Sequence, residues 1–183
     1  MNELLAKIFA VMSHRLIAAW STIPDTKVWL QSAVLLLLLT LISLPIGFQA
    51  GFFRAGLLQS SWVTIVGIAV TAFLMPAIAE ELFFRVLLLP HPTENPTSEM
   101  QWVWGCVSLI LFLVYHPLNG LSFFPTGLKT FREPIFLLLT ALLGVVCAIA
   151  YLQSGSLWPP VVIHWLVVVV WLLLLGGYKQ LYP

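Results

Sequence analysis

Residues 28–48 read VWLQSAVLLLLLTLISLPIGF, an apolar run that contains no ionisable side chain. A helix needs roughly 20 such residues to cross the hydrocarbon core of a lipid bilayer. Apolar and polar residues do not alternate along the run, as they would in a strand of a membrane β-barrel. The run therefore predicts an α-helix that spans a membrane.

Four further apolar segments follow along the chain: 62–89, 102–116, 134–152 and 158–176. Pro76 interrupts the first of them, which predicts either one kinked helix or a span followed by a partly re-entrant helix. Pro117 disfavours helical geometry in the residue before it, so we expect the next span to end near His116. The pattern predicts an all-α fold, a polytopic transmembrane helical bundle of about five to six membrane helices.

The composition agrees with a membrane environment. Hydrophobic residues make up 61% of the chain and charged residues 8%, whereas an ordinary globular protein has about 25% charged residues. Nucleic acid requires a dense basic patch, and a chain with a net charge of +1 and no such patch is not expected to bind it. We expect an integral, multi-pass membrane protein in contact with membrane lipid, and the sequence leaves its oligomeric state open.

Residues 1–27 are expected to form an N-terminal interfacial segment, and residues 28–183 one transmembrane domain. A helix in the N-terminal segment would place apolar and polar side chains on opposite faces: Leu5, Phe9, Met12 and Leu16 against Glu3, Lys7 and His14. Such a helix is suited to lie in the plane of the membrane surface. A short soluble tail is the alternative.

Ionisable side chains are rare in the apolar segments and occupy a few positions: Glu80, Glu81, Arg85, His116 and His164. A charged side chain costs roughly 2.5–3.5 kcal/mol at the centre of a bilayer on insertion scales, so it persists where a partner or a function offsets that cost. The segments 28–48 and 134–152 contain none. Two acids, one cation and two imidazoles are suited to acid–base catalysis.

Helical spacing separates the roles of the two acids. Glu81 and Arg85 stand at positions i and i+4, the order that favours an ion pair, and we expect them to be structural. Glu80 lies about 100° around the helix from Glu81 and stays free to act as a general base. His116 could assist a water molecule or bind a metal. Taken singly, His116 and His164 could each be an interhelical hydrogen-bond partner and no more.

Three short motifs, in this order, resemble those of a known family: Glu80-Glu81-Leu82-Phe83-Phe84-Arg85, Phe112-Leu113-Val114-Tyr115-His116, and Gly155-Ser156-Leu157-Trp158-Pro159 ahead of His164. The first is similar to the EExxxR motif, and the second to the FxxxH motif, of the CAAX-processing and bacteriocin-processing (CPBP) intramembrane proteases. That glutamic-type family includes the type II CAAX prenyl proteases. The likeness covers about residues 77–176.

This resemblance implies an intramembrane endopeptidase that hydrolyses a peptide bond in a membrane-associated protein or peptide. By the likeness, Glu80 would activate the attacking water together with His116. Glu81 and Arg85 would hold the motif helix in place. His164 would help to stabilise the oxyanion, which needs a donor aimed at the developing negative charge.

One position departs from the family pattern. The family usually has Asn or a similar polar residue four positions after its last histidine, and this chain has Val168 there. A valine side chain cannot donate a hydrogen bond. Either His164 acts alone, or Asn119 or the Trp165 indole takes the place of the missing donor, or the chain has kept the scaffold and lost peptidase activity.

A zinc-dependent version of the same peptidase is an alternative, because the family was long described as zinc-dependent. Glu80, His116 and His164 with an open fourth position would satisfy zinc chemistry. We expect instead a metal-free glutamate mechanism without a cofactor. Two other classes stay open: a proton or cation pathway, since Glu and His side chains also form relays in membranes, and a non-catalytic membrane scaffold or immunity-type protein.

Overall fold

The computed structural model describes residues 2–182, and within that range it contains helices and no β-strand. The longer helices are α1 (Asn2–Ser21), α2 (Thr26–Gln49), α3 (Trp62–Ala72), α4 (Ser98–Ser122), α6 (Pro134–Ser154) and α7 (Trp158–Leu174). The shorter elements are the π-helical η1 (Phe73–Glu80) and η2 (Leu82–Leu87), the 3₁₀ turns η3 (Pro92–Glu94) and η4 (Pro125–Gly127), and the short helices α5 (Leu128–Phe131) and α8 (Gly177–Leu181).

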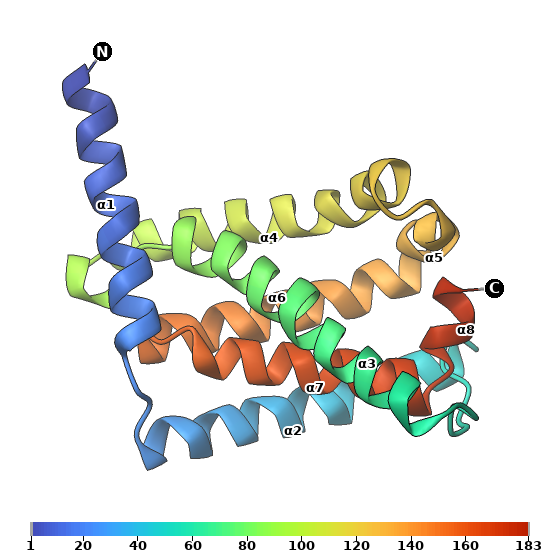
Figure 1. Ribbon diagram of the computed structural model, residues 1–183. Helices are drawn as coiled ribbons and strands as arrows, with labels where there is room; N and C mark the ends of the chain where they lie inside the picture. Colours follow the sequence, from blue (N-terminus) through green and yellow to red (C-terminus); the bar gives the residue numbers. More distant parts are fainter. Residues whose placement is uncertain (1, 183) are drawn as a thin grey trace.

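The helices that follow α1 form a bundle (Figure 1), in which α6 packs against α2, α4 and α7. Five helical stretches of the described chain are long and apolar enough to cross a membrane, namely α1, α2, the run from α3 to η3, α4 and α6. A sixth helix, α7, is apolar but shorter. These helices confirm the predicted all-α, multi-pass membrane bundle.

The helix that begins as α3 continues through η1 and η2 without a break. Pro76 lies inside η1, where its missing N–H cannot close the regular i→i−4 bond to Ala72, and the turns there widen to π-helical geometry. Of the two alternatives that the sequence left open, a single helix is therefore the correct one. The widened turns are those that carry Glu80 and lead into Glu81.

α4 passes through Pro117, so the predicted end of this span near His116 is wrong. Proline removes one backbone hydrogen bond, but its fixed φ suits a helix, and membrane helices accept it where neighbouring groups support the chain. Here Gly120 is buried so close to the backbone of Leu128 that a side chain on Gly120 would collide with it. This contact with α5 holds the turn after Pro117, and His116 lies inside the helix rather than at its end.

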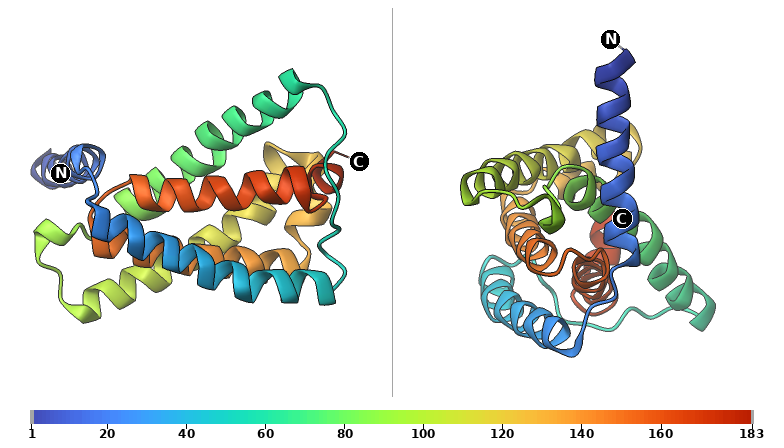
Figure 2. Two further views of the ribbon diagram at one scale, coloured as in Figure 1. Left: turned by 90° about the horizontal axis from the view of Figure 1, so that it is seen from below. Right: turned by 90° about the vertical axis from the view of Figure 1, so that its left-hand side faces the viewer.

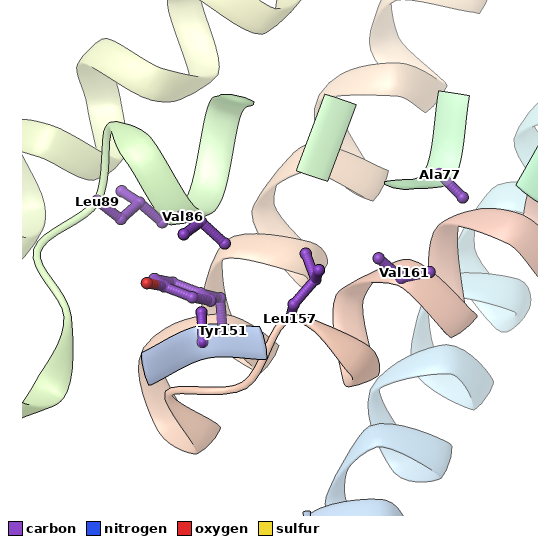
Figure 3. Packing of buried hydrophobic residues seen from close by; sticks show 7 residues of the cluster. Ala77, Val86, Leu89, Tyr151, Leu157 and Val161 are labelled. Carbon is purple, nitrogen blue, oxygen red and sulfur yellow. The ribbon is translucent and has the colours of Figure 1, made fainter. Parts of the chain in front are cut away.

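α1 lies across one end of the bundle, steeply inclined to the other helices, and its N-terminal half extends beyond them (Figures 1 and 2). Its C-terminal half joins a core cluster through Ala19, which is fully buried. Figure 3 shows other members of this cluster, with Val86 and Leu89 facing Tyr151 and Leu157. The interfacial role of residues 1–27 stays a prediction.

An extended segment after α2 covers the opposite end of the bundle. The backbone N–H groups of Arg54, Gly56 and Leu58 donate to the carbonyl oxygens of residues 175, 174 and 173 at 3.1, 2.9 and 2.8 Å. Carbonyl groups at the end of a helix have no following turn to bond them, so the extended segment satisfies those of α7. The C-terminal end of the helix that carries His164 is thereby fixed.

Candidate active site

Glu81 and Arg85 form a buried ion pair where η1 passes into η2. Arg85 Nε lies 3.1 Å from Glu81 Oε2, and the two side chains are 1% and 0% exposed. The two atoms are close but not aligned as a hydrogen bond. Arg85 also donates to the carbonyl oxygen of Gly144 on α6 at 3.3 Å, and its guanidinium lies 4.5 Å from the ring centroid of Phe112. The ion pair expected from the i, i+4 spacing is present, and it joins the motif helix to α4 and α6.

His164 on α7 lies between the two adjacent carboxylates. Its Nδ1 is 2.7 Å from Glu81 Oε1, and its Nε2 is 3.9 Å from Glu80 Oε2. An ionised carboxylate can only accept a hydrogen bond, so Nδ1 carries a proton and donates a hydrogen bond to Glu81. Nε2 is then the nitrogen that faces Glu80. Glu81 thus orients the imidazole as well as pairing with Arg85.

The side chain of Glu80 has a different environment from that of its neighbour. Its Oε2 is buried and has no hydrogen-bond partner within the described residues 2–182. His164 Nε2 lies 3.9 Å from this oxygen, which is too far away for a direct hydrogen bond. A buried oxygen without a partner is costly, so Glu80 is placed to accept a proton or a hydrogen bond from a molecule that enters the site.

His116 is buried inside α4 and is held by its own helix. Its Nδ1 lies 2.8 Å from the carbonyl oxygen of Phe112, so Nδ1 donates and Nε2 keeps its lone pair. The ring packs edge-on against Phe112, with centroids 4.9 Å apart, and against Phe136, with centroids 5.4 Å apart. The position at a helix terminus that the sequence suggested for His116 is therefore wrong, but Nε2 keeps the lone pair that can accept a proton.

The three predicted catalytic residues line one cavity of about 1260 Å³. Glu80 reaches it from η1, His116 from α4 and His164 from α7. Most of its lining is aliphatic and aromatic. A wide apolar cavity with a few convergent polar groups is typical of a binding site for a largely apolar ligand.

The structure separates the two residues considered as substitutes for the missing donor. The Trp165 indole N–H donates to the carbonyl oxygen of Ala69 at 2.9 Å, so it is already engaged. Asn119 lines the cavity, one helical turn after His116. Val168 also lines it, one turn after His164, so the position that usually carries a polar residue does face the cavity. Asn119 is the better candidate of the two.

The residues do not form a ready zinc site. Within residues 2–182, no three His, Cys, Asp or Glu side chains are grouped closely enough to hold a metal ion.

The contact between His164 and Glu81 is the feature that the sequence did not predict. The two residues are 83 positions apart on different helices, so no spacing rule connects them. A pattern within one helix pointed to Arg85 as the partner of Glu81, and a carboxylate with two oxygens can serve both. The only hint of this contact was that the carboxylate of Glu81 can accept more hydrogen bonds than Arg85 alone supplies.

A family model described as type II CAAX prenyl endopeptidase Rce1-like matches residues 60–170. The match runs from just before α3 into α7 and therefore includes Glu80, His116 and His164. It confirms the resemblance that the three motifs indicated. No curated protein and no solved structure matches the chain.

Proposed function

The chain belongs to the Rce1-like family of type II CAAX prenyl endopeptidases, and from this premise we propose that Glu80 activates a water molecule to hydrolyse a peptide bond in a membrane-associated substrate. Membership of the family makes the protein a membrane-embedded, peptidase-type protein whose substrate is a peptide. The assignment of Glu80, His116 and His164 as catalytic residues is part of the proposal.

One observation carries the proposal. Glu80 Oε2 is buried without a hydrogen-bond partner among the described residues, next to a cavity and 3.9 Å from His164 Nε2. Glu81 Oε2 also makes no hydrogen bond among these residues, but the Arg85 guanidinium lies 3.1 Å from it as a counter-charge, and Glu81 Oε1 accepts from His164. Of the two carboxylates, Glu80 is therefore the one available to a water molecule, and its partner His164 is held in a fixed orientation.

The charges in this site balance when His164 is protonated. Two carboxylates, Glu80 and Glu81, then face one guanidinium and one imidazolium, and the sum is zero. Buried charges that are paired in this way avoid the penalty of an isolated charge. In that state His164 donates from Nδ1 to Glu81 and presents a second N–H, on Nε2, to the cavity side.

The reaction follows in two steps. Glu80 takes a proton from water while the water oxygen bonds to the substrate carbonyl carbon, and the carbonyl oxygen becomes an oxyanion. The Nε2–H of His164 donates to that oxyanion. When the intermediate collapses, the C–N bond breaks, and Glu80 returns the proton to the leaving amine. The products are a carboxylic acid and an amine, and Glu80 is a carboxylate again.

His116 and Asn119 support the same step from α4. The free Nε2 of His116 can accept a hydrogen bond from the attacking water and so fix the direction of its lone pair. The amide of Asn119 can donate to the oxyanion from the next turn of the helix. Asn119 would then take the role that Val168 cannot fill.

The test is cleavage by the purified, full-length protein with Glu80→Gln, which keeps the shape of the side chain and removes its basicity. Glu99→Gln is the matched control, because Glu99 is exposed in the first turn of α4. The substrates are fluorogenic peptides with a C-terminal Cys-aliphatic-aliphatic-X sequence, with and without a prenyl group on the cysteine.

We expect Glu80→Gln to lose cleavage while its thermal unfolding matches the parent, and Glu99→Gln to cleave normally. Full cleavage by Glu80→Gln would end the proposal. A chelator separates the metal-dependent alternative: activity should persist after treatment, and loss that zinc restores would favour zinc.

A further inference from the structure

One face of α1 is buried in its C-terminal half and continues, uncovered, in its N-terminal half. Ala19 is 0% exposed against the bundle. Met12, Ile8 and Leu5 precede it by 7, 11 and 14 residues, which are close to whole multiples of the 3.6-residue helical turn. These three residues lie on the face of Ala19, yet they are 41%, 43% and 58% exposed.

The opposite side of the same half is charged. Lys7 Nζ and Glu3 Oε1 form an ion pair at 3.0 Å in which both side chains are largely exposed. Counted by helical rotation, Glu3 and Lys7 lie roughly 120–160° away from the face of Ala19. The projecting half of α1 is therefore apolar toward the side of the bundle and charged away from it.

The C-terminal half of α1 is fastened to the ends of two helices of the bundle. Arg15 donates to both carboxylate oxygens of Glu94, at 2.6 and 2.7 Å, and to the carbonyl oxygen of Leu87 at the end of η2. The backbone N–H of Leu157, just before α7, donates to the carbonyl oxygen of Ala19 at 2.9 Å. α1 therefore has a fixed position over the ends of η2 and α7.

This position determines what surrounds the projecting half. α1 crosses the end of the bundle and extends past its edge (Figures 1 and 2). Where the bundle helices span a membrane, a helix that crosses their ends lies along the membrane surface. Trp20 and Trp158 pack against each other at this end, with ring centroids 5.1 Å apart. Tryptophan is enriched where a bilayer meets water, so these rings mark the depth of the boundary.

We propose that the projecting half of α1 docks into the boundary between headgroups and acyl chains of a phospholipid bilayer. Leu5, Ile8 and Met12 enter the upper acyl chains, and Glu3 and Lys7 stay in water. The bundle covers this face of α1 at Ala19, and lipid covers the same face at Leu5, Ile8 and Met12. This surface lies outside residues 60–170, which the family model matches, and the proposal does not depend on peptidase activity.

Docking of this kind sets the depth of the active site. η2 is continuous with the segment that carries Glu80, and Leu157 precedes the helix that carries His164. Because α1 is fastened to both, a lipid-docked α1 keeps these two helix ends at one level relative to the membrane surface. Glu80 and His164 line the cavity further along these two helices, so the cavity then opens at a fixed depth for a substrate that is itself held in the membrane.

The test uses the full-length protein in phosphatidylcholine vesicles, with an environment-sensitive fluorophore on a single cysteine. Ile8→Cys and Lys7→Cys form a matched pair, because they are neighbours in sequence on different faces of α1. Both carry Cys106→Ser, since Cys106 is exposed, whereas Cys147 is buried and stays unlabelled. Quenchers are a nitroxide on the upper acyl chain, a nitroxide near the chain end, and aqueous iodide.

We expect the label at residue 8 to be blue-shifted and quenched by the upper-chain nitroxide, and the label at residue 7 to be quenched by iodide. Iodide quenching of both labels would place α1 in water and overturn the proposal. Protection of residue 8 from every quencher would mean that a second copy covers the face, and quenching of both labels by the deep nitroxide would mean that α1 crosses the bilayer. Either result also overturns it.

Discussion

The imidazole of His164 lies between two carboxylates that are neighbours in sequence but differ in their commitments. Glu81 binds Arg85 and accepts from His164 Nδ1, whereas Glu80 Oε2 has no hydrogen-bond partner within residues 2–182. Two acids of the same chemical type thus acquire separate tasks from their surroundings. We assign Glu81 to holding the site together and Glu80 to the chemistry.

At this scale, the Glu81–Arg85 pair makes a prediction about stability. Glu81→Gln should destabilise the folded protein by about 3–5 kcal/mol, because it leaves the buried Arg85 guanidinium without its counter-charge. The double variant Glu81→Gln/Arg85→Met removes both charges and should recover most of that loss. The measurement is unfolding by denaturant in mixed micelles. If the double variant loses as much stability as the two single variants together, the two charges are not coupled.

Val168 offers a gain-of-function prediction. Val168→Asn places an amide donor on the cavity wall one turn after His164, and a single oxyanion donor can be worth about 100-fold in rate when its geometry is ideal. We expect kcat/KM to rise by about 10-fold or more if the added amide reaches the oxyanion. Val168→Leu, which has the same branching at Cγ as the Asn variant and no donor, is the control. Equal rates in the two variants would exclude an oxyanion role for this position.

The sequence predicted the chemical inventory of the site but not its contacts. Ionisable residues inside apolar segments are conspicuous, so all five were found, and the pairing of Glu81 with Arg85 follows from helical spacing. The contact of Glu81 with His164, and the engagement of the Trp165 indole by Ala69, join different helices. Distances between helices depend on packing, which no local pattern encodes.

At the scale of the elements, two prolines had different effects. Pro76 coincides with a change to π-helical turns in η1, and Pro117 leaves α4 unbroken. The sequence predicted a disturbance at both, since the local rules for proline are the same. What differs is tertiary: Gly120 packs on Leu128 and holds the helix after Pro117. Segment positions were predictable from hydropathy, while helix continuity was not.

Gly144 provides a test of how closely α6 approaches its neighbours. A side chain there would meet Leu109 and Phe112 on α4, and the Gly144 carbonyl accepts from Arg85. Gly144→Ala should therefore cost about 1–3 kcal/mol of stability through overpacking. Gly105→Ala, on α4 with open space around the site, is the control and should stabilise the helix by about 0.5–1 kcal/mol. Unfolding in mixed micelles measures both, and a neutral Gly144→Ala would mean that the helices do not approach so closely.

At the scale of the whole molecule, the bundle gathers polar groups from distant parts of the chain around one cavity. η1, α4 and α7 supply Glu80, His116 and His164, and the extended segment after α2 and the helix α1 hold opposite ends of α7. A conduit for ions needs polar groups that step across the bilayer, whereas these groups are gathered at one cavity. This arrangement favours catalysis at one point over transport.

The central claim, that water activated by Glu80 is the nucleophile, is tested most directly by a single turnover in ¹⁸O-labelled water with the protein in excess over a cleavable peptide. Mass spectrometry then follows both the new carboxyl terminus of the product and the protein fragment that contains Glu80. We predict one ¹⁸O in the product, none in Glu80, and no product from Glu80→Gln. Label in the Glu80 carboxylate with an unlabelled product, or labelled product from Glu80→Gln, would contradict the account.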